Sequence, residues 1–150
     1  MVLKVGWRHD EALHEAEGLR AWSGAGAVRL LDARTFDQTS ALLREACGPG
    51  TPLSDRPERE QDVVVADLLS QLWITPPAGH PFRTLQSMCD GWADELETRQ
   101  AGDCGPELDP GVVFAGLALF RDLPRTAEQR VLLCTDLHAA TFSLPSASRG

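Results

Sequence analysis

Three short apolar runs near the start of the chain predict β-strands. Residues 2–5 form the first run, which contains a single charge, Lys4. Residues 27–31 and 40–43 form the other two, and a polar turn around Asp37 joins them into a predicted hairpin. The first third of the chain is therefore expected to build a small sheet.

A helix is predicted between the first two strands, over residues 9–23. Asp10 has the residue type and position of an N-cap. Leu19 and Trp22 mark the buried stripe of this helix. Glu15 precedes Leu19 by four residues, so it is expected on the same inward face.

Lys4 and Glu15 together suggest an ion pair. A lysine within an apolar strand is costly unless an anion meets it, and Glu15 faces inward from the next predicted element. Two plainer interpretations compete with the pair. Lys4 could be an edge lysine at a frayed terminus, and Glu15 could be an ordinary solvated helix residue.

The middle of the chain reads as helical after a sharp break at residues 47–50. Asp55 and Pro57 are expected to start the first helix of this part, and Pro76 and Pro77 to stop it. A wide apolar stripe supports this helix and comprises Val64, Val65, Leu68, Leu69, Leu72 and Trp73.

Two more helices follow. Apolar residues at helical spacing define the first of them and comprise Leu85, Met88, Cys89, Trp92, Ala93 and Leu96. Its other face carries acids expected to be solvated, namely Asp90, Asp94, Glu95 and Glu97. Asp109 before Pro110 predicts the N-cap of the last helix. Its inward residues are expected to be Val113, Leu117 and Phe120.

Residues 131–133 form an apolar run that reads as a buried strand. This strand would present the carboxylate of Asp136 where the chain leaves it, with His138 facing a cleft. A carboxylate at this place can receive the proton of a substrate hydroxyl.

The composition narrows the class of protein. The 150 residues suit one domain, and 43% apolar and 24% charged residues are ordinary for a soluble globular chain. A net charge of −8 argues against nucleic acid as a partner and could favour a cationic substrate. The four cysteines and four histidines are scattered without the spacing of a zinc site. No apolar run approaches the roughly 20 residues of a membrane helix, and a cytoplasmic location is expected.

The run Cys134-Thr-Asp136-Leu-His138-Ala resembles the catalytic loop of aminoglycoside phosphotransferases, in particular the streptomycin 6-kinase and hydroxyurea phosphotransferase branch. The resemblance implies an α+β, protein-kinase-like fold that is incomplete. Residues 1–47 would be a partial N-lobe, and residues 48–141 a partial helical C-lobe. Residues 142–150 resemble nothing in the family.

The resemblance also assigns roles. Lys4 would bind the phosphates of ATP and Glu15 would orient Lys4. The break at residues 47–50 would be the hinge between the lobes, and the backbone of Glu45, Ala46 and Cys47 would face the adenine edge. Asp136 would be the catalytic base in transfer of the ATP γ-phosphoryl group to a hydroxyl of a small antibiotic. Several acceptors fit, and the oligomeric state is left open.

Several parts of the family pattern are missing. Thr141 stands where the family has its metal-binding Asn, no glycine-rich phosphate loop precedes Lys4, and the downstream metal-binding Asp is absent. The Mg²⁺ site would be incomplete, and the chain alone is expected to be inactive. Loss of one adenine from codons for Ala-Ala-Asn-Val-Leu would produce the observed Thr, Phe and Ser at 141–143, which suggests a frameshifted gene. Two alternatives are a degenerate kinase that binds a nucleotide or drug, and an interaction protein.

Overall fold

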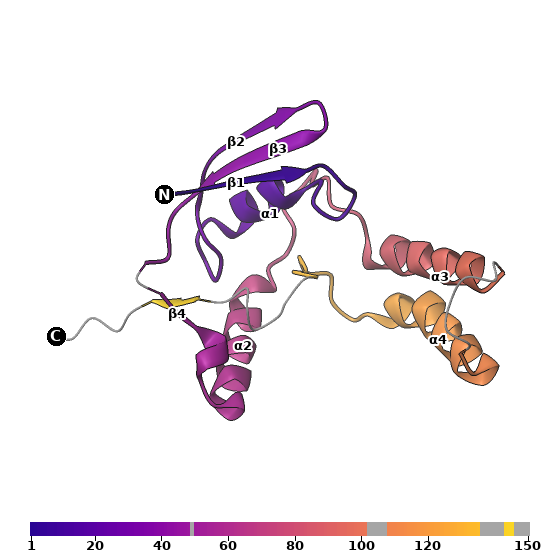
Figure 1. The fold of residues 1–150 in the computed structure, drawn as a ribbon. Coiled ribbons are helices and arrows are strands. Elements are labelled where there is room, and N and C mark those ends of the chain that lie inside the picture. Colours follow the sequence, from indigo (N-terminus) through magenta and orange to yellow (C-terminus); the bar gives the residue numbers. More distant parts are fainter. Residues whose placement is uncertain (49, 102–107, 136–142, 146–150) are drawn as a thin grey trace. The chain divides into compact units, whose positions relative to one another are not determined.

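The computed structural model of the chain describes residues 1–48, 50–101, 108–135 and 143–145 (Figure 1). The chain divides into two compact units. Unit 1 comprises Met1–His80 and Val131–Gly150, and unit 2 comprises Pro81–Arg130. These limits differ from the lobe boundaries expected at 47/48 and 141/142.

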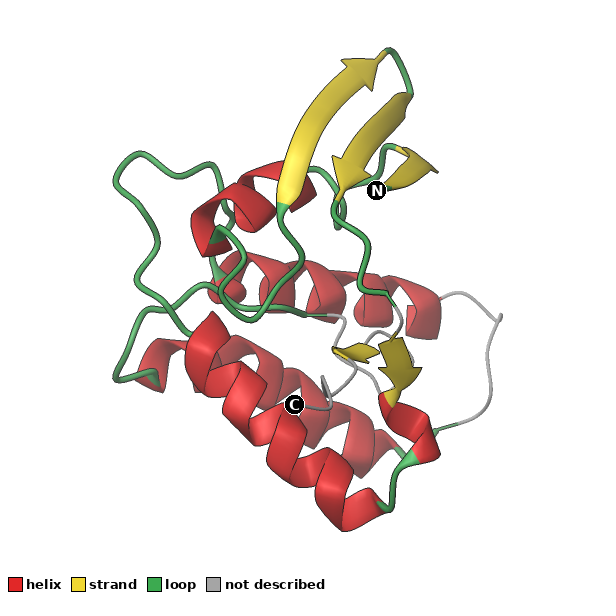
Figure 2. Ribbon diagram, turned by 90° about the vertical axis from the view of Figure 1, so that its left-hand side faces the viewer, coloured by secondary structure: helices red, strands yellow, loops and turns green. Residues whose placement is uncertain are grey.

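Unit 1 contains a three-stranded antiparallel sheet in the order β1-β3-β2 (Figure 2). Its strands are β1 (Val2–Trp7), β2 (Leu30–Phe36) and β3 (Thr39–Arg44). The predicted hairpin is confirmed, but β2 was misplaced in the sequence analysis, where it covered residues 27–31. A two-residue turn pairs Phe36 with Thr39 and so fixes the register, which carries β2 to Phe36. Together with the helices, this sheet confirms the α+β class.

The two faces of the sheet have different surroundings. Lys4 and Leu42 are paired in register and share the face that carries α1 (Glu15–Trp22), where Leu42 is buried. The opposite face exposes the large apolar side chains of Leu3, Val5, Trp7 and Phe36. Helix α1 therefore covers only one side of the sheet.

Helix α1 begins six residues later than the sequence predicted, so Asp10 is not its N-cap. The preceding residues form turns instead, with bonds from the Ala12 N–H to the His9 carbonyl and from the Glu15 N–H to the Ala12 carbonyl. Because these bonds span three residues, the segment does not continue as an α-helix. The helix ends at Ser23, whose φ of 51° is left-handed.

Helix α2 (Glu58–Leu72) follows a short 3₁₀ turn, η1 (Leu53–Asp55), and ends close to α1. The Trp22 indole N–H donates to the Leu72 carbonyl at 2.9 Å. The glycine at position 26 passes close to the same end, since a Cβ there would lie 3.3 Å from the Leu72 side chain. The apolar stripe of α2 is half-buried, except that Leu72 is buried and Trp73, just past the helix, is exposed.

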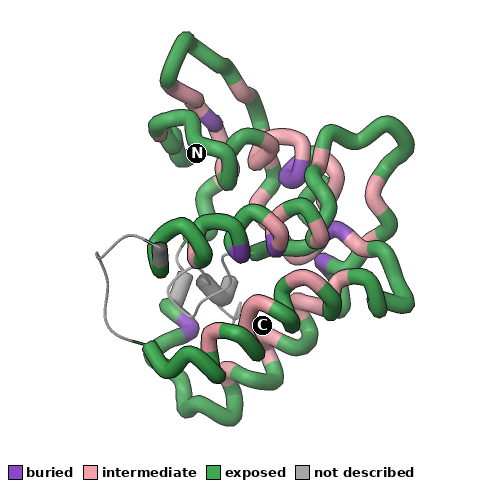
Figure 3. Tube along the Cα trace, turned by 90° about the vertical axis from the view of Figure 1, so that its right-hand side faces the viewer, coloured by how far each residue is buried: buried purple, intermediate pink, exposed green. Residues whose placement is uncertain are grey.

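Residues 131–133 do not form the strand predicted from their apolar character. Leu132 is buried and its N–H donates to the Ile74 carbonyl at 2.8 Å, whereas Leu133 is exposed. One backbone bond anchors the segment without building a ladder. Among the described residues of unit 1, the buried ones are few (Figure 3), and they comprise Leu19, Leu42, Leu53, Leu72 and Leu132, besides Gly18. A short antiparallel pair, β4 (Gly50–Pro52) with β5 (Ser143–Pro145), was not predicted.

Unit 2 consists of α3 (Leu85–Ala101), α4 (Pro110–Asp122) and the 3₁₀ turn η2 (Leu123–Thr126). The predicted N-cap of α4 is confirmed, because the Asp109 carboxylate accepts bonds from the N–H groups of residues 111 and 112 at 2.8 and 3.1 Å. Cys89 and Ala93 are the buried positions of α3, and the Trp92 ring meets Phe120 edge-on at 6.0 Å. No helix in the described part of the chain has the length and apolar character to cross a bilayer.

Candidate functional site

Lys4 and Glu15 form the predicted ion pair. The Lys4 Nζ lies 2.7 Å from Oε2 and 2.8 Å from Oε1 of Glu15, so both carboxylate oxygens accept from one ammonium. β1 supplies the lysine and α1 the glutamate. The Lys4 side chain is 46% exposed and that of Glu15 is 26% exposed. Glu15 is thus the more enclosed partner, and Lys4 keeps a side open to solvent.

Arg44 is a third member of this cluster, and the sequence analysis missed it. Its Nη1 lies 3.8 Å from Oε1 of Glu15, and its side chain is 26% exposed. The Arg44 Nε is buried without a hydrogen-bond partner. Strand periodicity could have found this residue, because Arg44 follows the buried Leu42 by two positions and so shares its face.

The hinge-side segment predicted to face adenine, residues 45–47, follows β3 directly, and Glu45 already makes hydrogen bonds there. Its N–H donates to the Arg29 carbonyl at 3.0 Å, and its carboxylate accepts from the Arg29 N–H at 2.7 Å. These bonds extend the β2–β3 pairing by one step beyond the strands. The Glu45 N–H therefore cannot meet an adenine, and the role falls to the backbone of Ala46 and the exposed Cys47.

The register of the sheet brings the hinge end of β3 next to Lys4. Val2 pairs with Arg44 and Lys4 pairs with Leu42. The end of β3 is thus two residues from the level of Lys4, or about 7 Å at the usual rise of a strand. A lysine and the two remaining hinge residues consequently lie at one end of the same pair of strands.

The hollow next to this cluster is small. A cavity of about 60 Å³ lies between α1 and the sheet, with Glu15 and Leu42 among its lining residues. A water molecule takes about 30 Å³ in the liquid, so this space suits water rather than a nucleotide. A nucleotide would have to bind on the open side of the Lys4 ammonium.

Asp136, His138 and Thr141 lie outside the described residues. The roles of Asp136 as base and of Thr141 at the metal position stay predictions. Among residues 1–48, 50–101, 108–135 and 143–145, no group of three or more His, Cys, Asp and Glu is arranged to hold a metal ion.

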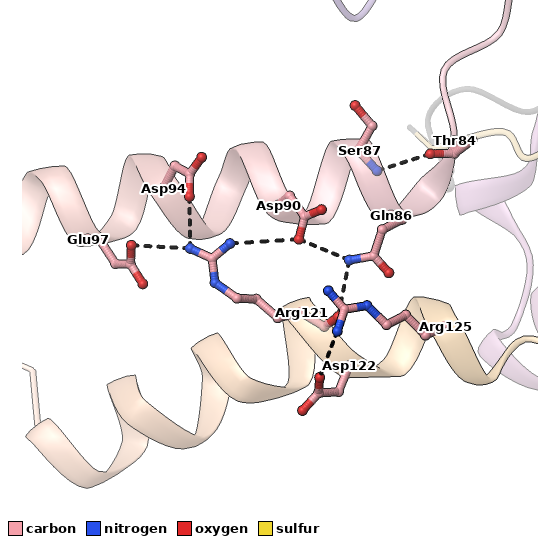
Figure 4. Close-up of polar contacts among 9 residues, drawn as sticks. All are labelled: Thr84, Gln86, Ser87, Asp90, Asp94, Glu97, Arg121, Asp122 and Arg125. Carbon is pink, nitrogen blue, oxygen red and sulfur yellow. Dashed lines mark hydrogen bonds and ion pairs between the residues drawn. The ribbon is translucent and has the colours of Figure 1, made fainter.

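A second polar cluster lies in unit 2 and is centred on Arg121 of α4 (Figure 4). The guanidinium contacts three carboxylates of α3, at 2.8 Å from Asp94, 3.2 Å from Glu97 and 3.7 Å from Asp90. The acidic face of α3 is largely exposed, as predicted, and three of its carboxylates also contact Arg121. Gln86 closes the cluster by donating to Asp90 at 2.9 Å and to the Arg121 carbonyl at 3.1 Å.

Arg121 links α4 to α3 through its contacts with the three carboxylates. The hydrogen bonds that it donates to Asp94 and Glu97 raise the pKa of its guanidinium above the ordinary value. It therefore stays cationic and can take no part in proton transfer. Sequence reasoning missed it because its partner Asp94 is 27 residues away along the chain.

The described cysteines differ in reactivity. Cys89 is buried, and this burial, together with the nearby charge of Asp90, raises the pKa of its thiol. Cys47 and Cys134 are exposed. Cys47 lies in the segment predicted to face adenine, and Cys134 lies at the start of the predicted catalytic loop.

Comparisons with protein-family models, with curated proteins and with solved structures found no match to the chain.

Proposed function

We propose that the chain comes from a kinase-like phosphotransferase, with an incomplete kinase fold, and that unit 1 carries the nucleotide site. The observation that carries the proposal is the Lys4–Glu15 ion pair, formed between a strand and the following helix. A lysine of this kind, held by a helix glutamate, binds nucleotide phosphates in protein kinases. The resemblance of the Asp136 loop to aminoglycoside phosphotransferases points to the same reaction class.

The residues around the pair fit the phosphates of ATP in two respects. Lys4 is fixed by two short contacts yet is 46% exposed, so an anion can reach its ammonium without burying it first. The sheet register puts Arg44, the end of β3, two residues from the level of Lys4, and the exposed Cys47 follows three residues later. ATP would then extend from the hinge backbone to Lys4, with Glu15 holding the lysine in place.

The reaction of the parent enzyme would be transfer of a phosphoryl group to an alcohol of a small antibiotic, such as an aminoglycoside or a hydroxyurea-like compound. The alcohol oxygen bonds to the γ-phosphorus, the bond from that phosphorus to the ADP oxygen breaks, and Asp136 takes the hydroxyl proton. Mg²⁺ supplies charge neutralisation in such transfers. The sequence has Thr141 where the family has its metal-binding Asn, so we expect the chain alone to be inactive.

Calorimetric titration with ATP, with and without Mg²⁺, tests the proposal. We expect ATP to bind, with weaker binding in the Lys4→Ala chain because one phosphate contact is lost. Metal-dependent binding would support a remnant of the complete phosphotransferase site. Metal-independent binding would favour the alternative, a degenerate kinase that serves as a nucleotide-binding module.

The control variant is Arg34→Ala, which removes a cation from the same sheet. Arg34 is 73% exposed and pairs with Asp32 at 3.5 Å, and its register with Ala41 puts it on the sheet face opposite Lys4. Equal weakening by Lys4→Ala and Arg34→Ala would show a general charge effect and contradict a site at Lys4. Absence of ATP binding in the unmodified chain would overturn the proposal and favour an interaction protein.

A further inference from the structure

We infer that Arg44 is a second phosphate-binding cation, so that Lys4 and Arg44 together form a site for the polyphosphate part of a nucleotide. This inference rests on the proposed nucleotide site and adds a residue to it. The observations behind it are the charge balance of the cluster, the unmet bonding capacity of Arg44 and the geometry of the two strands.

The cluster carries more positive than negative charge. Lys4 and Arg44 contribute two cations and Glu15 a single carboxylate, which leaves one net positive charge. Both oxygens of Glu15 are already within 2.8 Å of the Lys4 ammonium. The neighbouring acid on α1, Glu17, pairs with Arg20 at 3.6 Å instead. Glu15 is therefore shared between two cations, and Arg44, at 3.8 Å, is the more distant of them.

The Arg44 guanidinium also has N–H groups that donate no hydrogen bond to the described residues. A guanidinium has five N–H groups in a planar fork. The nearest carboxylate oxygen lies 3.8 Å from its Nη1, beyond hydrogen-bond distance, and its Nε is buried without a partner. An enclosed donor that lacks an acceptor is costly, so an incoming anion would gain from meeting this side chain.

The strand geometry lets one ligand reach both cations. Lys4 and Arg44 are diagonal neighbours on adjacent strands, since Val2 pairs with Arg44 and Lys4 with Leu42. Diagonal residues of an antiparallel pair share a face and lie about 7–8 Å apart at the backbone. Two long cationic side chains at this spacing can contact successive phosphates of one chain. The guanidinium fork suits a phosphate in a bidentate manner.

The test titrates the full chain with inorganic tripolyphosphate, with ATP and with adenosine, and compares three variants. Arg44→Leu removes the charge, Arg44→Lys keeps the charge without the fork, and Arg34→Leu removes an exposed cation on the opposite face of the sheet. Circular dichroism melts confirm that each variant is folded. We expect Arg44→Leu to weaken tripolyphosphate and ATP by roughly tenfold or more, since a charge-assisted contact is lost. Arg44→Lys should recover part of the affinity, and Arg34→Leu should change it less than about twofold.

Each outcome separates this inference from the proposed function. ATP binding that is unchanged in Arg44→Leu overturns the role of Arg44 and leaves the nucleotide site standing. Arg44-dependent binding of tripolyphosphate, with ATP no tighter and adenosine not bound, supports the anion site and overturns the nucleotide site. Equal losses in Arg44→Leu and Arg34→Leu, or no binding of any probe, overturn the inference. If Arg44→Leu fails to fold, the Arg44→Lys result decides, because loss of affinity without loss of charge requires the fork.

Discussion

Glu15 holds the Lys4 ammonium with both carboxylate oxygens, at 2.7 and 2.8 Å, across the space between α1 and β1. The contact joins a helix to a strand that is otherwise paired only with β3 in the described sheet. It therefore has a structural effect as well as the proposed effect on nucleotide binding, and the two can be measured apart.

A double-mutant cycle with Lys4→Ala and Glu15→Ala should show coupling in the free energy of unfolding. We expect a coupling of about 0.5–1 kcal/mol, because both side chains are partly exposed and solvent screens the pair. Urea denaturation of the four proteins measures it. Additive single losses would contradict a direct interaction, and the coupling should shrink in 1 M salt.

Trp22→Phe should destabilise unit 1 by about 1–3 kcal/mol, because the Leu72 carbonyl loses its indole donor and packing area is lost. The donor lies 2.9 Å from this carbonyl and ties α1 to the end of α2. Trp7→Phe is the matched control, since Trp7 is 73% exposed. Thermal denaturation of both variants measures the effect, and equal melting temperatures would contradict this role of Trp22.

Arg121→Gln should lower the melting temperature more than Arg125→Gln does. Arg121 contacts three carboxylates of α3, which would repel one another without this cation. Arg125 instead forms an ion pair with Asp122, three residues before it. The difference between the variants should narrow in 1 M salt, where charges are screened over about 3 Å. An effect of Arg121→Gln that is no larger than that of Arg125→Gln would show that the cluster does not hold the helices together.

Cys89 should react with iodoacetamide more slowly than Cys47 and Cys134 in the folded chain. Its pKa is raised by burial and by Asp90, so its reactive thiolate appears only at higher pH than usual, and its side chain is also enclosed. Mass spectrometry of the labelled chain at several pH values follows each cysteine. Rapid labelling of Cys89 before unfolding would contradict its burial, while labelling in urea serves as the control.

The sequence predicted correctly those features that depend on residues close together along the chain. The stripe of α2, the Asp109 cap and the inward position of Glu15 follow from spacings of a few residues, and the structure has all three. The Lys4–Glu15 contact could be predicted because strand and helix are successive elements.

Other features depend on contacts between residues far apart along the chain, which the sequence alone does not reveal. The apolar run at residues 131–133 has the composition of a strand, but only the Leu132 N–H finds a backbone acceptor, Ile74. Arg121 and Arg44 meet their carboxylates through tertiary contacts between elements. The predicted start of α1 was wrong. Asp10 is an acceptable N-cap residue, but the residues around it form turns whose hydrogen bonds span three residues, so the α-helix begins later.

The most direct test of the nucleotide site is a heteronuclear NMR titration of the ¹⁵N-labelled chain with ATP. The account predicts that the largest amide shift changes fall on Lys4, the Glu15 region, Arg44, Ala46 and Cys47, and that they weaken in the Lys4→Ala chain. Resonances of α3 and α4 serve as the internal reference, since the Arg121 cluster has no proposed ligand. Shift changes confined to residues 85–126, or none at millimolar ATP, would contradict a nucleotide site at the Lys4–Glu15 pair.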